Sequence, residues 1–236
     1  MLNVLKLLVF VLAVVMLSCA DYKELNLSVT YGSIKDDRDG RVYKTVIIGE
    51  QEWMAENLKY NKDNSIGICY EDPKVDDPDK DSDTTKCIKY GRLYTWIEAM
   101  NINNAEFNYK HYNETTNDTI FHGICPEGSH LPSFNEWNNL FHYIGVSNGG
   151  DKLKTVNDWN PPGTNEYGFS AMPAGDRMLT NTKYMFRFLG TCGAWWSSTE
   201  SFTTFQILSY QICEEYNSKG VLFEKASWAS IRCIKD

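Results

Sequence analysis

The chain has 236 residues, a formal net charge of −8 at pH 7, seven cysteines and 14% aromatic residues. Because phosphate contacts require clustered Lys and Arg, an acidic chain without basic clusters is unsuited to nucleic-acid binding. The length suits one large domain or two small ones. The odd number of cysteines indicates that one of them has a role apart from disulfide pairing within the chain.

The first residues have the features of a secretory signal. Lys6 supplies a positive charge, and Leu7–Leu17 is an apolar run of eleven residues. A membrane-spanning helix needs about 20 residues, whereas a shorter run fits the core of a signal peptide. The sequence Met16-Leu-Ser-Cys19-Ala is similar to the cleavage box of bacterial lipoproteins, although Met16 stands where Leu is usual. This resemblance implies that Cys19 becomes the first residue and carries diacylglycerol; the alternative is an ordinary signal with an accidental cysteine.

These features divide the chain into three parts. We expect a lipoprotein signal peptide at residues 1–18, a lipidated tether at residues 19–32 and one domain at residues 33–236. Each buried methylene of an acyl chain contributes about 0.8 kcal/mol to membrane binding, so two or three chains anchor a protein stably. Removal of Lys6 with the signal changes the net charge to −9, so the lipid must supply the attraction to the membrane.

Two alternating runs at the start of the domain predict a β-hairpin. Ser28–Ile34 and Arg41–Ile48 alternate in polarity, and the pair Asp39-Gly40 lies between them. An Asp-Gly pair between such runs is a strong signal for a tight turn. A calcium-binding EF-hand loop would need an acidic ligand where Lys35 stands, so the turn is the preferred interpretation.

An acidic segment lies between Cys69 and Cys87. It contains two prolines, many acids and almost no apolar residue, which is typical of a surface loop. Asp79, Asp81 and Asp83 alternate in a way that could chelate calcium. The glycine bend of a calcium loop is missing, which favours a solvated loop and leaves calcium binding as the alternative.

Two helices are expected in the first two thirds of the chain. One covers residues 91–100, where Leu93 and Trp96 begin an apolar face. The second begins after Ser133, which can cap the helix while Glu136 reaches back to form a capping box. Its apolar stripe consists of Phe134, Trp137, Leu140, Phe141 and Ile144, and Gly145 fits its end.

The rest of the chain has the pattern of short strands and turns. Residues near Gly193–Thr199 can pair with Thr204–Tyr216 as a hairpin, and Ser227–Ile234 is expected to be the last strand. Early helices followed by short antiparallel strands predict an α+β fold.

Taken in chain order, these motifs resemble the Fibrobacter succinogenes major paralogous domain. The motifs are Asp37–Leu58, Cys69-Tyr70, Tyr90–Trp96, Cys125-Pro126, His130-Leu-Pro, Glu136-Trp137, Leu153-Lys154, Gly168–Ala171, Trp196–Thr199 and Ile231–Cys233. The resemblance covers about residues 33–236. The chain departs from the family pattern at Ser129, where Trp is usual, and in its long acidic insert before Cys87.

Part of this pattern is also similar to the formylglycine-generating-enzyme branch of C-type-lectin-like folds. The similar parts are the block His130–Trp137 and the Arg232-Cys-Ile sequence. The resemblance implies a two-lobed, C-type-lectin-like domain, with two helices beside small antiparallel sheets and much irregular loop. It implies no particular activity, because function resides in sites rather than in folds.

The sequence indicates no catalytic residue, metal site or cofactor. The enzyme branch uses two closely spaced cysteines to handle copper and oxygen, whereas Cys213 and Cys233 are twenty residues apart. The calcium motifs of sugar-binding lectins are absent, and no two histidines have the i, i+4 spacing of a metal site. A Ser-His-Asp or Cys-His arrangement stays open, because such partners meet only in three dimensions.

The six cysteines after Cys19 fit disulfides better than zinc. None forms a Cys-x-x-Cys pair, and exported proteins mature in oxidising compartments. Six cysteines allow fifteen connectivities. The favoured pairs are Cys69–Cys87 around the acidic loop, Cys192–Cys213 across a hairpin, and Cys125–Cys233, a whole-domain bridge of the kind that lectin-like folds have.

The combined interpretation is a lipid-anchored protein of the bacterial cell envelope, on the periplasmic or surface face of the outer membrane. Its domain is expected to bind a glycan or a protein without catalysis. The candidate surface consists of Trp159, Tyr167, Trp195 and Trp196, although burial in the core is the stronger expectation for these side chains. The alternatives are an enzyme of the formylglycine-generating type, a hydrolase with an unrecognised site, and a structural envelope component.

Overall fold

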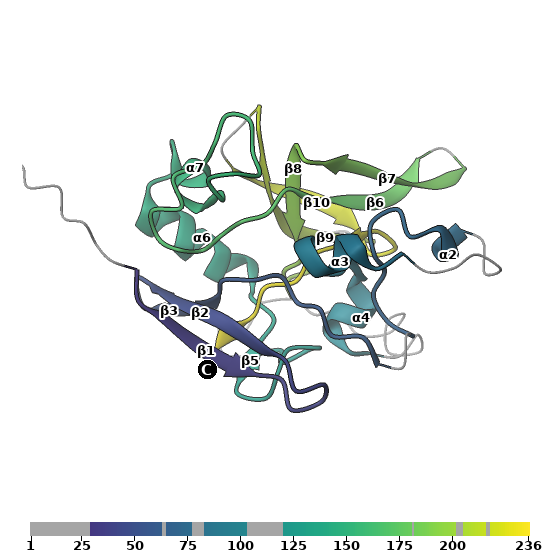
Figure 1. The fold of residues 1–236 in the computed structure, drawn as a ribbon, viewed down its shortest axis with the longest axis horizontal. Helices are drawn as coiled ribbons and strands as arrows, with labels where there is room; N and C mark the ends of the chain where they lie inside the picture. Colours follow the sequence, from purple (N-terminus) through teal and green to yellow (C-terminus); the bar gives the residue numbers. More distant parts are fainter. Residues whose placement is uncertain are drawn as a thin grey trace, which may run out of the picture.

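The computed structural model describes residues 29–62, 65–76, 83–102, 120–180, 182–201, 205–215 and 218–236. The strands in these ranges form two sheets, which Figure 1 shows at the lower left and at the top. The first sheet has the order β1 (Tyr31–Lys35), β2 (Val42–Ile48), β3 (Gln51–Met54), β12 (Ile234–Lys235) and β5 (Ser129–His130). The predicted lipid site and residues 19–28 of the predicted tether lie outside the described ranges, whereas the last two tether residues, Tyr31 and Gly32, belong to β1.

The second sheet contains the longest strands of the molecule. Its order is β10 (Lys219–Glu224), β9 (Gln206–Cys213), β8 (Cys192–Trp195), β6 (Ala174–Thr180), β11 (Trp228–Ala229) and β4 (Tyr94–Thr95), and β7 (Lys183–Leu189) pairs with β6. All pairs in this sheet are antiparallel except β6 with β8, which is parallel at Gly175 and Gly193.

The fold is mostly β, so the expected α+β, C-type-lectin-like domain with small sheets is wrong. The longest described helix, α6 (Phe134–Ile144), has eleven residues. The others are α2 (Pro73–Asp76), α3 (Thr85–Tyr90), α4 (Trp96–Met100) and α7 (Gly149–Leu153). The correction has a physical reason: the segments between Ala174 and Glu224 extend into strands of six to eight residues that pair along their length, and β7, β9 and β10 contain the aromatic and β-branched residues that favour strands.

Two sequence predictions about single elements also need correction. The helix expected at residues 91–100 begins only at Trp96, because Tyr94 and Thr95 pair with β11 as strand β4. A capping box then starts α4: Thr95 Oγ1 accepts from the backbone of Glu98, and the Glu98 carboxylate accepts from Thr95 N at 2.7 Å. The expected strand at Ser227–Ile234 is divided between β11 and β12, which belong to different sheets.

Three local predictions are confirmed. Strands β1 and β2 form the expected hairpin, with Lys35 opposite Val42 across the turn. Helix α6 begins at the capping box of Ser133 and Glu136. Strands β8 and β9 pair in the register that places Cys192 opposite Cys213.

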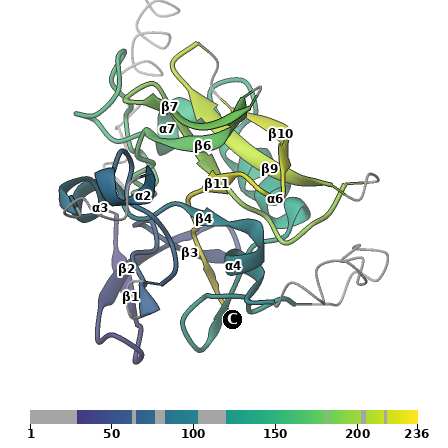
Figure 2. The same cartoon turned by 90° about the vertical axis from the view of Figure 1, so that its right-hand side faces the viewer.

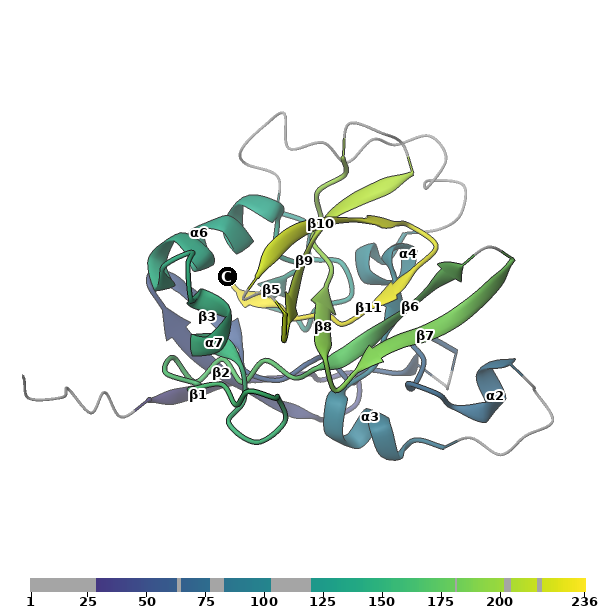
Figure 3. The same ribbon diagram turned by 90° about the horizontal axis from the view of Figure 1, so that it is seen from above.

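The apolar core consists of two clusters. One contains Trp96 and Trp196, and the other contains Trp53, Trp137 and Trp195, all fully buried. Figure 3 shows α6 and α7 on the side of the molecule away from α2 and α3. No helix in the described ranges is long and apolar enough to span a membrane.

The last described segment joins the two sheets. Strand β11 pairs with β4 and β6 of the second sheet, and β12 pairs with β3 and β5 of the first. Figure 2 shows this yellow segment passing from one sheet to the other. Residues 230–233 therefore lie between the sheets, where Arg232 is fully buried.

Candidate ligand-binding site

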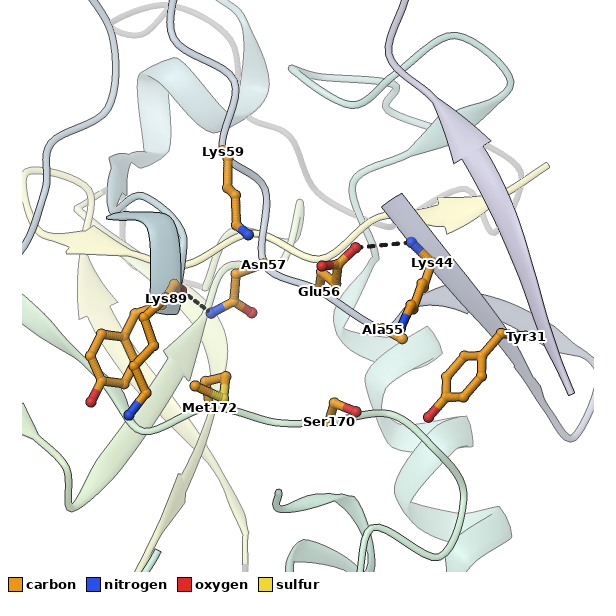
Figure 4. A pocket seen from close by; sticks show the side chains of 10 residues that line it. Tyr31, Lys44, Ala55, Glu56, Asn57, Lys59, Lys89, Ser170 and Met172 are labelled. Atoms are coloured by element: carbon orange, nitrogen blue, oxygen red, sulfur yellow. Dashed lines mark hydrogen bonds between the residues drawn. The ribbon is translucent and has the colours of Figure 1, made fainter. Parts of the chain in front are cut away.

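A small open pocket lies among strands β1 and β2, the segment after β3, the end of α3 and the loop before β6 (Figure 4). Its volume is about 230 Å³, which is smaller than the ~300–1,000 Å³ typical of sites for drug-sized ligands. Its largest side chains are the lysines Lys44, Lys59 and Lys89 and the tyrosines Tyr31 and Tyr90. The pocket thus suits a small polar ligand.

Asn57 lies in the lining of the pocket and is fully engaged by the protein (Figure 4). Its Oδ1 accepts hydrogen bonds from Trp195 Nε1 at 2.9 Å and from Arg232 Nε at 2.8 Å. Its Nδ2 donates to the carbonyl of Tyr90 at 2.8 Å and to Ser230 Oγ at 3.2 Å. Asn57 therefore holds α3, the second sheet and the segment after β3 together around the pocket.

Arg232 places a buried positive charge behind the pocket. Its guanidinium donates to the carbonyls of Met54 at 3.2 Å, Phe169, and Ser170 at 2.7 Å. Burial lowers the pKa of Arg232 to about 9, and the Glu56 carboxylate partly opposes this shift. The guanidinium consequently stays charged at neutral pH and adds positive potential to the site.

The three lysines come from different elements. Lys44 is at an exposed position of β2, Lys59 follows β3, and Lys89 is in the last turn of α3. Lys89 Nζ forms a salt bridge of 2.8 Å with Asp158. Lys44 Nζ lies 5.5 Å from the centroid of the Tyr31 ring.

The loop before β6 closes one side of the pocket. Ser170 has a left-handed backbone, with φ of 57°, and is held by Asn165, whose side chain accepts from Ser170 N at 2.8 Å. Gly168 also has positive φ, and an added Cβ would lie 2.8 Å from the hydroxyl oxygen of Tyr31. This close approach requires glycine and fixes the loop against β1.

Glu56 provides the pocket's acidic group. Its Oε2 accepts a hydrogen bond of 3.0 Å from the backbone N of Lys44, as Figure 4 shows. Glu56 is half-buried and shares the lining with the three lysines. It is the sole carboxylate among the described side chains of the lining.

A second polar cluster surrounds His130 in β5. His130 Nε2 lies 2.8 Å from Glu136 Oε1, and His130 Nδ1 lies 2.7 Å from Asp236 Oδ1. Burial disfavours the imidazolium, but the hydrogen bonds to Glu136 and Asp236 outweigh it and raise the pKa of His130. Because Glu136 also caps α6 at Ser133, this cluster connects β5, α6 and the segment after β12.

The predicted ligand surface of aromatic side chains is not present. Trp159 is 5% exposed, and Trp195 and Trp196 are 0% exposed, so their expected burial in the core is confirmed. Their Nε1 groups donate inward, to Ala171 O at 2.8 Å, Asn57 Oδ1 at 2.9 Å and Tyr94 O at 2.7 Å. Tyr167 is partly buried and lies edge-on to Tyr143, with ring centroids 6.1 Å apart.

The six domain cysteines form three disulfides. The pairs are Cys69–Cys87, Cys125–Cys233 and Cys192–Cys213, which are the pairs that the sequence favoured. Cys125–Cys233 links the segment before β5 to the segment before β12. Cys69–Cys87 connects α3 to the chain that precedes the acidic loop, and so supports one wall of the pocket.

Two of the three aspartates proposed to bind calcium in the acidic loop, Asp79 and Asp81, lie outside the described ranges. Asp83 is described, and its Oδ1 accepts from the backbone and the hydroxyl of Thr85. Within the described part of the chain, no group of three or more His, Cys, Asp or Glu side chains could hold a metal ion.

Sequence reasoning missed Tyr31, Lys44 and Lys59 as site residues. They belong to two strands and a connecting segment, and isolated surface lysines carry no local signal. Their common location depends on the β1–β2 pairing and on the contact of β1 with the loop at Gly168. A non-local contact of this kind is not encoded by any short motif.

One of three comparisons with known proteins gives a match. The family described as the Fibrobacter succinogenes major domain matches residues 46–235. No curated protein and no solved structure shows a significant match. The matched region includes β3 to β12 and most of the pocket lining, but Tyr31 and Lys44 precede it.

Proposed function

This chain belongs to the Fibrobacter succinogenes major domain family, and we propose that it is a non-catalytic binding module of the bacterial cell envelope that holds a glycan in the pocket of Figure 4. The observation that carries the proposal is the pocket's combination of tyrosine rings and polar groups in a volume of about 230 Å³. A sugar ring offers C–H groups on its faces, which pack on an aromatic ring, and hydroxyls at its edge, which hydrogen-bond to polar side chains.

The chemistry of the pocket favours binding over hydrolysis. Glycoside hydrolysis generally requires two carboxyl groups about 5–9.5 Å apart. Glu56 is the single acidic side chain among the described lining residues, and it already accepts from Lys44 N. A formylglycine-generating activity of the kind considered above would need free thiols, whereas the cysteines that the structure describes are all in disulfides.

The location belongs to the same proposal. A cleaved signal and a lipid on Cys19 would tether the domain to the outer membrane, facing the periplasm or the cell surface. The support is the similarity of Met16–Ala20 to a lipoprotein cleavage box and the presence of disulfides, which persist in oxidising compartments. The alternative is that the protein is a purely structural component of the envelope, a role that requires no ligand in the pocket.

A binding measurement tests the proposal. The full chain, purified in detergent, is applied to an array of bacterial and plant glycans and compared with a Tyr31→Ala variant, which removes the exposed ring of the pocket. Tyr184→Ala is the matched control, because Tyr184 is 38% exposed on β7, against 42% for Tyr31. We expect Tyr31→Ala to abolish binding and Tyr184→Ala to retain it. Absence of any glycan binding, or equal losses in both variants, would refute the proposal.

A further inference from the structure

The charge of the pocket is opposite to that of the chain. The chain as a whole has a formal net charge of −8. Three lysines and one carboxylate line the pocket; with Arg232 behind the lining and Asp158 beside Lys89, four cationic side chains and two carboxylates leave a local formal excess of two positive charges. The cations are Lys44, Lys59, Lys89 and Arg232, and the carboxylates are Glu56 and Asp158. A concave site with one sign of charge concentrates its field and attracts ligands of the opposite sign.

Two of these lysines have no carboxylate partner for their ammonium groups in the described part of the chain. Salt bridges with carboxylates occupy Lys35, Lys86, Lys89, Lys154, Lys225 and Lys235. Within the described ranges, Lys44 and Lys59 have no such partner, although both line the pocket. An acidic protein has ample carboxylates to pair them, so two unpaired ammonium groups in one small pocket are available to a ligand.

The neighbouring groups neutralise only part of this positive charge. Glu56 is the nearest acid in the lining, and its Oε2 is directed to the backbone N of Lys44 rather than to an ammonium group. Arg232 donates to carbonyl and amide oxygens, none of which carries a charge. Figure 4 shows Lys44 and Lys59 on either side of Glu56, with the Tyr31 ring beside Lys44.

From this arrangement we infer that the ligand is an anionic saccharide, whose carboxylate or phosphate group is bound by Lys44 and Lys59 and whose ring packs on Tyr31. The inference rests on the proposed glycan-binding function and adds the charge of the ligand to it. Hydrogen bonds between charged groups are roughly twice as strong as neutral ones, so the oxyanion would supply much of the affinity.

Titration calorimetry with the full chain in detergent tests the inference. The probes are D-glucuronate, glucose 6-phosphate, neutral D-glucose and inorganic phosphate, each at low and at high salt. We expect at least one of the two anionic sugars to bind at least tenfold more tightly than glucose and than inorganic phosphate, with affinity that falls as salt rises. The two anionic sugars separate a carboxylate ligand from a phosphate ligand.

Lysine variants provide the matched comparison. Lys44→Gln and Lys59→Gln should each weaken the anionic sugar about tenfold, as expected for loss of one charge-assisted hydrogen bond. Lys183→Gln makes the same charge change at an exposed position of β7 and should leave affinity unchanged. Lys44→Gln and Lys59→Gln should each change the affinity for glucose by less than twofold.

The outcomes separate the two proposals. Equal binding of glucose and the anionic sugars, unaffected by Lys44→Gln and Lys59→Gln, would overturn the anionic ligand and leave a neutral glycan site. Binding of inorganic phosphate as tightly as of either sugar would show a simple anion site and overturn the saccharide. Failure of every sugar here and of every glycan on the array would refute the proposed function itself.

Discussion

Arg232 Nε donates a hydrogen bond of 2.8 Å to Asn57 Oδ1, across a sequence separation of 175 residues. The bond joins the segment between β11 and β12 to the segment that follows β3. Both side chains are buried. Arg232 donates to the carbonyl of Ser170 and Asn57 donates to the carbonyl of Tyr90, and both carbonyls belong to residues that line the pocket. The shape of the pocket therefore depends on a contact between residues far apart in the chain.

The first prediction concerns this contact. Arg232→Lys keeps the buried charge but loses the planar fork that reaches Asn57, Met54, Phe169 and Ser170 together. Orphaned buried acceptors cost about 1–3 kcal/mol each, so we expect a loss of about 2 kcal/mol or more in unfolding free energy. Urea unfolding of the two proteins measures this difference in unfolding free energy.

The control for this experiment is the same substitution at Arg41, which is exposed and bonded to Asp39. Arg41→Lys should change stability by less than about 0.5 kcal/mol. Equal effects of the two variants would mean that the fork of hydrogen bonds at Arg232 does not stabilise the fold.

The local elements of this fold could be predicted because their signals are short. The Asp39-Gly40 turn specifies the β1–β2 hairpin, and Ser133 with Glu136 specifies the start of α6. The disulfide Cys192–Cys213 follows from the hairpin pairing of β8 and β9. In each case the physical cause lies within a few residues or within one hairpin of consecutive strands.

The sheets and the site could not be predicted, because non-local pairing decides them. Tyr94 and Thr95 have a helix-compatible pattern, yet pairing with Trp228 and Ala229 makes them a strand. Burial of Trp195 is the stronger expectation from the sequence and is confirmed, but its hydrogen bond to Asn57, which also binds Arg232, depends on contacts far apart in the chain. Hydrophobic content alone does not distinguish a buried aromatic side chain from one that contacts a ligand.

The second prediction concerns pH. The raised pKa of His130 means that protonation stabilises the fold; this contribution is complete below its ordinary pKa of 6.5 and is lost as pH rises through the folded pKa. For Glu136, burial opposes ionisation, but the hydrogen bonds to His130 and Ser133 outweigh it and lower the pKa. The contribution of Glu136 to stability is present above pH 4.5, its ordinary pKa, and is lost as the pH falls through its lowered pKa in the folded protein. This cluster therefore stabilises the protein most between about pH 4.5 and 6.5.

Thermal unfolding of the full chain from pH 4 to 9 checks this second prediction. His130→Gln should lower the melting temperature near pH 5.5 and flatten its decline toward pH 8. His142→Gln is the control, because His142 is exposed in the last turn of α6. An undiminished alkaline decline in His130→Gln would assign the pH dependence to other groups.

The third prediction concerns the proposed lipid anchor at Cys19, a residue outside the described ranges. Cys19→Ser removes the thiol that would carry the lipid, so the protein should leave the membrane fraction. Met16→Leu introduces the residue that is usual in lipoprotein signals, so this variant should stay entirely in the membrane fraction. Mass spectrometry of the mature N-terminus provides the decisive readout: an unmodified Cys19 in the native protein would exclude lipidation.

The last prediction compares two disulfides. Cys125–Cys233 closes a loop with a separation of 108 residues, and Cys69–Cys87 closes one of 18. In the chain-entropy model a bridge stabilises by restricting the unfolded chain, by about 5 kcal/mol for the longer loop and about 3 kcal/mol for the shorter. Replacing both cysteines of a pair by alanine should therefore lower the unfolding free energy more for Cys125 and Cys233.

Burial makes this disulfide comparison a matched one. All four cysteines are at most 7% exposed, so the loss of packing is similar in the two double variants. Guanidinium unfolding, with its slope compared between variants, separates a change in stability from a change in the unfolded state. A larger loss for Cys69 and Cys87 would show that the bridge beside the pocket stabilises the folded wall itself, rather than restricting the unfolded chain.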